Sequence, residues 1–452
     1  MRSVFVARNP YTGKVIGEYR GWSEDELKHS IRAACRAQRA WREESVERRA
    51  SLLRQLAHAL EARAEDAACV ITAEMGKPIR EARAEVAKCA KSLRVIAERA
   101  PEWLRPRTLH EPDLRAEVRY APLGVILGVM PWNFPFWQVV RFAGPAVAAG
   151  NGCVIKHAPS TPGCAEMLDE LFTEVFGDLV RVGVFAEGLV HEAIGWPEIA
   201  GASLTGSVRA GRAIAETCGR HLKPCVLELG GSDPYLVLDD VEIEAVAQAC
   251  VAARMINSGQ TCIAAKRWIV HARIADAFTD AVRAALAALN VGDPMDEATD
   301  IGPLARADLR DRVASQVDQS VAQGARIAWQ GEAPSSGFFY PPTLLADVCP
   351  GMPAWDEELF GPVAALAVAA DEDEMLVLAN HSAFGLGGGV FSGDPARAER
   401  LARRLQAGVV GVNRYVVSDP RVPFGGVKAS GYGRELGPEG VRAFTNVQTL
   451  LF

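Results

Sequence analysis

Two short motifs, Glu-Leu-Gly-Gly at 228–231 and Asn-Ser-Gly-Gln-Thr-Cys at 257–262, decide how this chain folds. Glu228 ends an apolar run typical of a buried strand, and the two glycines allow a turn that a Cβ would obstruct. Val246–Ile256 has helical spacing, which the Asn-Ser-Gly sequence ends. A strand, a helix and a loose turn therefore bring an acid and the thiol of Cys262 to one place, where strand ends of open α/β sheets carry chemistry.

The composition is that of an ordinary globular protein with two or three domains. Of its 452 residues, 49% are hydrophobic and 23% are charged, which argues against disorder. The N-terminus lacks the pattern of a signal peptide, and no stretch of about 18 apolar residues is free of charge. These features predict no membrane contact and a cytoplasmic location. A net charge of −7, spread along the chain, argues against a nucleic-acid partner.

Cysteine and histidine usage argues against a metal centre. The ten cysteines form no pairs with a two-residue gap, and most lie in apolar patterns. The eight histidines make no metal-ligand pair on a helix. We therefore predict no metal and nine cysteines that serve only packing.

Strand and helix patterns alternate through the middle of the chain. A helical layer is expected from Ser23 to about Leu104, followed by a half-exposed strand at 114–120. From Leu123 on, apolar runs alternate with helical patterns, and a second such unit follows Cys262. This alternation predicts an α/β protein whose parallel sheets are covered by helices.

One turn has the character of an anion site. Thr205, Gly206 and Ser207, with Gly211 further on, lead a strand into a helix N-terminus through small residues. The spacing is not that of the triple-glycine dinucleotide fingerprint. A structural turn is therefore an equal alternative to a phosphate site.

Three residues together offer the parts of covalent catalysis on a carbonyl. Cys262 is the candidate nucleophile, Asn133 the oxyanion donor together with the backbone N–H of Cys262, and Glu228 the base that activates water. A thiohemiacetal collapses by losing hydride, so a nicotinamide would have to lie beside the sulfur, held by the Gly206 turn and Lys156. Aldehyde oxidation fits these parts. Taken singly, each residue has a structural alternative: a core cysteine, a cap or charge pair, and a turn asparagine.

With these residues together, the chain resembles the aldehyde dehydrogenase superfamily over nearly its whole length. The matching motifs are Pro131-Trp132-Asn133, Thr205-Gly206-Ser207 with Gly211, Glu228–Gly231, Gly259-Gln260 with Cys262, and Glu358 with Phe360-Gly361-Pro362. Lys156–Pro159 and Phe424–Lys428 look most like the bacterial succinate-semialdehyde dehydrogenases that accept NAD or NADP.

The resemblance implies a fold and an assembly. A Rossmann-like cofactor-binding domain is expected at 1–106 and 123–226, a catalytic α/β domain at 227–435, and a small β oligomerisation arm at 107–122 and 436–452. The arm would extend a neighbouring subunit's sheet, which implies a homodimer or homotetramer. The resemblance also makes the nucleophile, base and oxyanion roles those of Cys262, Glu228 and Asn133.

The resemblance also implies a cofactor site, whose residues would contact both the adenosine end and the nicotinamide end of NAD or NADP. Trp132, Ser207 and Lys156 would contact its pyrophosphate and adenosine ribose. Glu358 would hold the nicotinamide ribose, with Phe360 near the ring. The full expected set is Pro131, Trp132, Lys156, His157, Pro159, Ser160, Thr205, Gly206, Ser207, Gly211, Leu229, Glu358 and Phe360.

Two departures from the family pattern bear on the cofactor and the base. Pro159 stands where many strictly NAD-dependent members have a glutamate that repels a 2′-phosphate, so NADP is not excluded, and Ser160 could donate to a phosphate. Asn446 stands where some members have an acid that shares the base role. Glu228 is therefore expected to act alone.

Arg141 matches one carboxylate-binding arginine of the succinate-semialdehyde type. Ile256 stands where a second arginine occurs in some of these enzymes, so a substrate carboxylate would depend on Arg141 or on a loop residue such as Arg421. Phe136, Trp137 and Tyr415 could instead line a pocket for an apolar or aromatic aldehyde. Arg141 as a plain surface charge is the structural alternative.

The sequence thus predicts NAD(P)-dependent oxidation of a small aldehyde, most simply succinate semialdehyde, to a carboxylate. Two rivals remain. A non-catalytic binding or structural protein of the same fold would have no reason to keep Cys262, Glu228 and Asn133 together. A coenzyme-A-acylating relative would lack the glutamate that Glu228 supplies.

Overall fold

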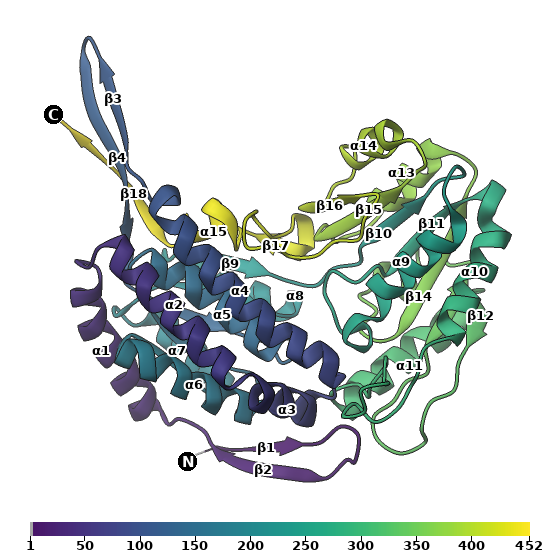
Figure 1. The fold of residues 1–452 in the computed structure, drawn as a ribbon, viewed down its shortest axis with the longest axis horizontal. Helices are drawn as coiled ribbons and strands as arrows, with labels where there is room; N and C mark the ends of the chain where they lie inside the picture. Colours follow the sequence, from purple (N-terminus) through teal and green to yellow (C-terminus); the bar gives the residue numbers. More distant parts are fainter. Residues whose placement is uncertain (1–2) are drawn as a thin grey trace.

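The computed structural model describes residues 3–452 as an α/β protein with two large sheets and a small protruding one (Figure 1). The α/β prediction is confirmed. No helix in this described range is long and apolar enough to cross a membrane.

The first large sheet has six strands in the order β17-β9-β8-β5-β6-β7. All neighbours run parallel except β17, which is antiparallel to β9. The chain moves outward from β5 to β7 and then returns to the other side of β5 at β8. The bounds are β5 (Val125–Val129), β6 (Gly152–Lys156), β7 (Val180–Gly183), β8 (Ile199–Thr205), β9 (Cys225–Glu228) and β17 (Gly431–Tyr432).

This reversal of strand order makes a crevice at the carboxyl ends of β5 and β8, the place where open α/β sheets bind ligands. β6 is buried along its whole length and β5 up to Val129, which is half-buried, as their apolar runs predict. The connecting helices are α5 (Pro135–Ala148), α6 (Pro162–Phe176), α7 (Glu187–Gly195) and α8 (Val208–Arg220).

A layer of helices from the N-terminal part covers this sheet (Figure 1). The first begins at a capping box, in which Ser23 accepts from the N–H of Glu26 and the Glu26 carboxylate accepts from the N–H of Ser23. Gly76 ends the third in a left-handed conformation, φ 77°. The bounds are β1 (Val4–Arg8), β2 (Val15–Arg20), α1 (Glu24–Trp41), α2 (Val46–Ala62), α3 (Ala64–Met75) and α4 (Ile79–Trp103).

The second large sheet has seven strands in the order β12-β13-β14-β11-β10-β15-β16, parallel except for β12. Its strands are β10 (Pro234–Val237), β11 (Arg267–His271), β12 (Arg326–Gln330), β13 (Thr343–Ala346), β14 (Val363–Ala369), β15 (Gly387–Phe391) and β16 (Val409–Val412). Its helices are α9 (Ile243–Met255), α10 (Ala275–Ala287), α11 (Ala307–Ala322), α12 (Pro353–Asp356), α13 (Glu372–Asn380) and α14 (Pro395–Ala402).

The small sheet projects from the first body with the order β18-β4-β3 (Figure 1). Its strands are β3 (Arg107–Glu111), β4 (Leu114–Pro122) and β18 (Thr445–Leu451). The C-terminal run pairs antiparallel with β4, with Val447 opposite Tyr120. This sheet therefore joins the two segments that the resemblance assigns to the arm.

Two details differ from the expected division of the chain. Residues 437–442, expected in the arm, form the helix α15 (Gly437–Arg442), which packs on α4 and α5, so the protruding strand begins only at Thr445. β17 lies within the range expected to form the catalytic domain but pairs with β9 of the first sheet. The reason is that the chain crosses back to the first body after β16. The domain boundaries themselves stay predictions.

Candidate active site

Cys262 lies in a tight turn that follows α9. A short 3₁₀ turn, η2 (Ile256–Gly259), contains Asn257 and Ser258 in the left-handed region, with φ 56° and 54°. Gly259 follows with φ +76°, and a Cβ there would lie 2.2 Å from the carbonyl oxygen of Gly361. Only glycine allows this approach, and it fixes where Cys262 leaves the turn.

The surroundings of Cys262 keep its thiol protonated. Burial raises the pKa of the Cys262 thiol to about 11, although the cations Arg141 and Lys266 oppose the shift. The direction is upward because the loss of solvent outweighs the two cations.

Asn133 is held in place by two hydrogen bonds. Its Nδ2 donates to the carbonyl oxygen of Gln260 at 3.0 Å, and its backbone oxygen accepts from Nδ2 of Asn257 at 2.8 Å. The amide of Asn133 has two N–H groups, so one orients the side chain and the other can donate elsewhere. This geometry supports the oxyanion role, which stays a prediction.

Glu228 ends β9 inside the protein, with 2% of its surface exposed. Neither of its carboxylate oxygens takes a hydrogen bond from the described residues. Burial raises the pKa of Glu228 well above its usual range, and Arg141 opposes the shift. A carboxyl group with a raised pKa is suited to act as a base near neutral pH.

A second buried acid, Glu435, lies near Glu228 and influences its charge. Glu435 forms an ion pair with Arg141, and both side chains are almost fully buried. A second acid therefore lies in the site, and the expectation that Glu228 acts alone as the base stays a prediction. Asn446, considered as the place of a second acid, lies in β18 opposite Ala121.

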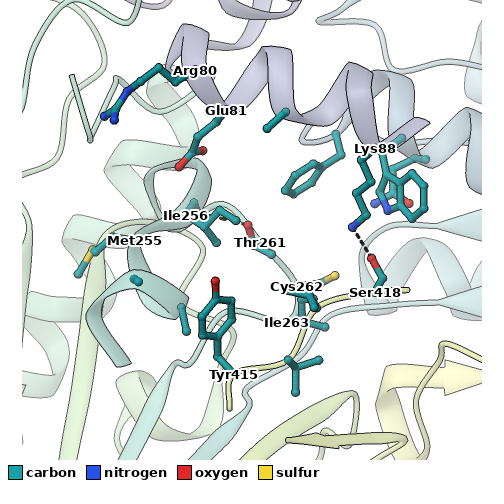
Figure 2. Close-up of a pocket in the computed structure, with 18 of the residues that line it drawn as sticks. Arg80, Glu81, Lys88, Met255, Ile256, Thr261, Cys262, Ile263, Tyr415 and Ser418 are labelled. Carbon is teal, nitrogen blue, oxygen red and sulfur yellow. Dashed lines mark hydrogen bonds between the residues drawn. The ribbon is translucent and has the colours of Figure 1, made fainter. Parts of the chain in front are cut away.

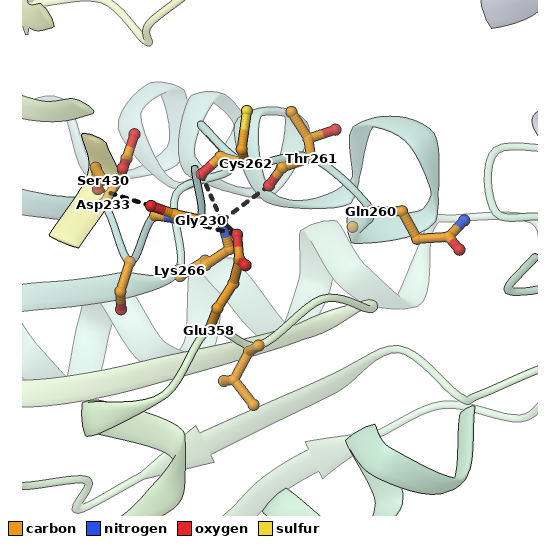
Figure 3. A network of polar contacts seen from close by, with 12 residues as sticks. Gly230, Asp233, Gln260, Thr261, Cys262, Lys266, Glu358 and Ser430 are labelled. Atoms are coloured by element: carbon orange, nitrogen blue, oxygen red, sulfur yellow. Dashed lines mark hydrogen bonds and ion pairs between the residues drawn. The ribbon is translucent and has the colours of Figure 1, made fainter. Parts of the chain in front are cut away.

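A buried lysine connects the cysteine turn to Glu358 (Figure 3). Nζ of Lys266 donates to the carbonyl oxygens of Thr261 at 2.8 Å and Cys262 at 2.6 Å, and lies 3.4 Å from Oε1 of Glu358. The same Oε1 accepts from the N–H of Gly231 at 3.0 Å. A Cβ at Gly230 would lie 2.5 Å from the Glu358 carboxylate. The two glycines after Glu228 therefore make room for this network.

Sequence reasoning missed Lys266. The signal was available as a lysine that interrupts an apolar run four positions after Cys262. Buried cations are paired as a rule, so such a lysine indicates an internal partner.

Two cavities meet at Cys262. One, of about 460 Å³, extends between α4, the start of α5 and the loop at 415–418 (Figure 2). The other, of about 170 Å³, lies at the carboxyl ends of β5, β8 and β9. Both have Cys262 in their walls. A sulfur at such a junction can contact one molecule from each side.

Comparison with known proteins decides the family. The family model described as the aldehyde dehydrogenase family matches residues 2–450. The chain belongs to this family. It is an oxidoreductase that acts on the aldehyde group, and the family and fold predicted from its motifs are confirmed.

Among its relatives, the succinate semialdehyde dehydrogenase Sad of Escherichia coli K12, named for NAD(P)+, is 46% identical over 98% of this chain and 97% of its own. The NADP+ succinate-semialdehyde dehydrogenase of Deinococcus radiodurans is 42% identical over 98% and 93%. The crystal structure of succinic semialdehyde dehydrogenase from Streptococcus pyogenes with NADP+ superposes with a TM-score of 0.96, at 33% identity over 99% of each chain.

The smaller cavity of this aldehyde dehydrogenase contains most of the predicted cofactor residues. Ser207 caps α8 by accepting from the N–H of Ala210 at 3.2 Å, so the helix N-terminus opens toward the cavity. Phe360 packs edge-on against Trp132, with ring centroids 5.8 Å apart. The predicted residues in the cavity wall are Pro131, Trp132, Thr205, Gly206, Ser207, Leu229, Glu358 and Phe360.

The other predicted cofactor residues lie outside that wall. His157 is fully buried and bridges the carbonyl oxygen of Pro135 and the hydroxyl of Thr161, which is a structural role. Lys156 and Ser160 flank it, and the hydroxyl of Ser160 is buried without a partner among residues 3–452. Outside the wall are Lys156, His157, Pro159, Ser160 and Gly211, the last of which packs under Leu229.

The larger cavity contains Trp137, Arg141 and Tyr415, as expected for substrate residues. Phe136 does not reach it, because its side chain turns into the core with 0% exposure. Arg421 does not reach it either, since it is exposed and paired with Asp419. Phe136 therefore lies on the core side of α5, and Arg421 is held by an acid two residues earlier in the chain.

No group of His, Cys, Asp and Glu side chains in the described chain could hold a metal ion.

Proposed function

We propose that this enzyme oxidises succinate semialdehyde to succinate with NAD+ or NADP+. The observation that carries the proposal is the meeting of two cavities at Cys262. The smaller cavity has a helix N-terminus suited to phosphate, and the larger one has the cations Lys88 and Arg141 in its wall. The names of the curated relatives support the same substrate and cofactors.

Catalysis would begin at Cys262. Its sulfur bonds to the carbonyl carbon as the thiol proton leaves to solvent, and the carbonyl oxygen becomes an oxyanion that the free N–H of Asn133 stabilises. A nicotinamide held by the residues of the smaller cavity would supply the hydride acceptor for the collapse of this adduct to a thioester. Glu228 then takes a proton from water, the water oxygen bonds to the acyl carbon, and the C–S bond breaks to free the carboxylate.

The side chains around the smaller cavity fit a dinucleotide. Trp132 and Ser207 would bind the pyrophosphate and ribose, Glu358 the nicotinamide ribose, and Phe360 the ring. Lys156 ends β6 and Ser160, whose hydroxyl has no partner among residues 3–452, follows it, where the family places the adenosine ribose. Because Pro159 brings no carboxylate, both NAD+ and NADP+ should be accepted.

We expect succinate semialdehyde to exceed butanal in kcat/KM by on the order of ten- to a hundredfold. The two aldehydes have equal chain length, and a charge-assisted hydrogen bond to the carboxylate contributes roughly 1.5–3 kcal/mol. Initial rates of NADH or NADPH formation, measured with both cofactors, check this. Benzaldehyde is the control for the aromatic alternative: a preference for it would favour a pocket based on Trp137 and Tyr415.

We further propose that the enzyme assembles as a homodimer or homotetramer through its arm. β18 is an unpaired edge of the small sheet, and its Val447 and Leu451 are 59% and 72% exposed. β16 is an unpaired edge of the second large sheet. Exposed edges of this kind are normally covered. The mass of the protein by light scattering tests this proposal, and a monomer would contradict it.

A further inference from the structure

Helix α4 presents two acids to the segments that frame the catalytic cysteine. Glu81 and Glu85 are four residues apart, so they lie on the same face of the helix. Glu85 accepts from two N–H groups in the first turn of α5, at 3.0 and 2.9 Å. Glu81 accepts from the N–H of Asn257 at 2.6 Å, in the turn that leads to Cys262. One helix therefore holds both the segment after the Asn133 loop and the cysteine turn.

Asn257 connects Glu81 to the oxyanion donor. It is fully buried and has φ 56°, so the chain leaves the helical direction there and its N–H needs an acceptor from another element. Its Nδ2 donates to the backbone oxygen of Asn133 at 2.8 Å and to the carbonyl oxygen of Gln260 at 3.2 Å. This one residue therefore links the carboxylate on α4 with both the oxyanion loop and the cysteine turn.

The contact between Glu81 and Asn257 joins the two large bodies of the protein. α4 packs on α5 of the first body, whereas Asn257 follows α9 of the second. In Figure 2, Glu81 extends from α4 toward the turn that contains Ile256. A carboxylate at this place can therefore fix the cysteine turn relative to the first body, in which Asn133 lies.

The surroundings of Glu81 make its ionisation sensitive to pH near neutrality. The loss of solvent raises the pKa of Glu81 to about 7; Lys77 and Arg80 oppose the shift, and Asp300 adds to it. Lys77 is itself paired with Glu85, and Arg80 is paired with Asp300 at 2.7 Å. The ionised form of Glu81 is the stronger acceptor for the N–H of the turn, because a charge-assisted hydrogen bond exceeds a neutral one.

Removing this acceptor would leave a backbone N–H inside the protein without a partner. Such a group carries its full desolvation penalty, so the turn would relax toward another acceptor. Because Asn257 also holds the backbone of Asn133, the movement would shift the free N–H of the Asn133 amide. An oxyanion donor stabilises the developing charge only at hydrogen-bond distance, so the shift would slow the first chemical step.

We propose that Glu81 is a positioning residue of the oxyanion site: it holds Asn257 and, through it, Asn133 at the place where the carbonyl oxygen of the aldehyde becomes negative. This inference rests on the proposed function for the oxyanion role of Asn133, and it does not depend on which aldehyde is the substrate. Glu81 acts through the turn and touches none of the reacting atoms.

The test measures the single-turnover rate of NADH formation in Glu81→Leu and Glu81→Gln, with succinate semialdehyde and with butanal. Leucine has a similar size but accepts no hydrogen bond, so the rate at about pH 8 should fall roughly ten- to a hundredfold. Both aldehydes should lose the same factor, while their KM values and the Kd of NAD+ change by no more than about threefold. Glutamine accepts through its amide oxygen and should recover part of the loss.

The ratio of the wild-type rate to the Glu81→Gln rate is a readout that a packing role would not change with pH. Glutamine resembles the protonated acid, so the two proteins should have similar rates at about pH 6. At about pH 8.5 the wild type should be faster by roughly three- to tenfold, because its carboxylate is then ionised. Titration of Cys262 and Glu228 occurs in both proteins and cancels in the ratio. A ratio independent of pH would overturn the inference.

Two further variants make the result specific. Arg83→Gln breaks an ion pair between α4 and Glu297 of the second body at the surface, and it should leave the rate unchanged. An equal loss in this control would indicate general loosening and overturn the inference. Asn257→Gly keeps the left-handed backbone but removes Nδ2, so adding Glu81→Leu to it should cost much less than in the wild type, and full additivity would contradict the proposed connection. If Glu81→Leu does not fold, the pH comparison with Glu81→Gln still decides.

The inference and the proposed function fail differently. If Asn133→Ala slows the single turnover and Glu81→Leu does not, the role of Glu81 is wrong and the proposed chemistry stands. If Asn133→Ala leaves the rate unchanged, the proposed oxyanion role is wrong, and the role of Glu81 is overturned with it. A loss confined to one of the two aldehydes would also overturn the inference, because it would show that Glu81 contacts the substrate rather than the turn.

Discussion

Replacing Cys262 with alanine should abolish aldehyde oxidation while leaving the fold and cofactor binding intact. The sulfur is the only atom proposed to bond to the substrate, so kcat should fall on the order of 10⁴-fold or more. Cys262 lies in the walls of both cavities, and removing one sulfur atom there should change the free energy of unfolding by no more than about 1 kcal/mol. Steady-state NADH formation, thermal unfolding and equilibrium binding of NAD+ or NADP+ measure these three properties.

Cys349→Ala is the matched control for this variant. Cys349 is the exposed cysteine of the chain and lies outside both cavities. Its replacement should leave the rate unchanged and should remove a thiol that reacts with alkylating reagents. Measurable normal turnover by Cys262→Ala would exclude the covalent mechanism.

Replacing Glu228 with glutamine should separate the two halves of the reaction. The thioester should form with a burst of NADH equal to the number of active sites, and its hydrolysis should then be slower by roughly 10²- to 10⁴-fold. Stopped-flow absorbance resolves the burst from the steady state. Burial raises the pKa of Glu228, so its protonated form is favoured in the fold and its ionisation becomes destabilising as pH rises. Glutamine resembles the protonated acid, so the Tm at neutral pH should not fall.

Hydroxylamine provides the control for Glu228→Gln. It attacks thioesters without help from a base, so its addition should restore steady NADH formation only if the thioester accumulates. A slow residual hydrolysis would be consistent with Glu435, which lies near Glu228 but is held by Arg141. A variant without any burst would contradict the assignment and place Glu228 before hydride transfer.

The fold could be predicted from local patterns to a useful extent. Helical spacing at 162–176 predicts a helix, and α6 has the same ends. The apolar run at 151–156 predicts a strand that ends at Lys156, and β6 ends there. The turn before Cys262 was recognised because asparagine and glycine favour left-handed backbone, as the φ of 56° at Asn257 shows. These features depend on a few neighbouring residues, so the sequence contains them directly.

Local patterns did not show which side chains face the cavity, because this depends on how one element packs against another. Phe136 and Trp137 are adjacent and both aromatic, yet Phe136 lies in the core and Trp137 in the cavity wall. Which one faces the substrate is set by the rotation of α5 against α4 and the first sheet, which no short window of sequence contains.

What the sequence determined by itself was the family, the α/β architecture and the three residues offered to one site: Cys262, Glu228 and Asn133. What only the tertiary structure decided was the balance of charge around them. Arg141 and Glu435 are far apart in the chain but form an ion pair, and Glu81 of α4 accepts from the N–H of Asn257. Motifs report which side chains are present. Ion pairing and desolvation depend on the distance between atoms and on burial, and only folding sets both.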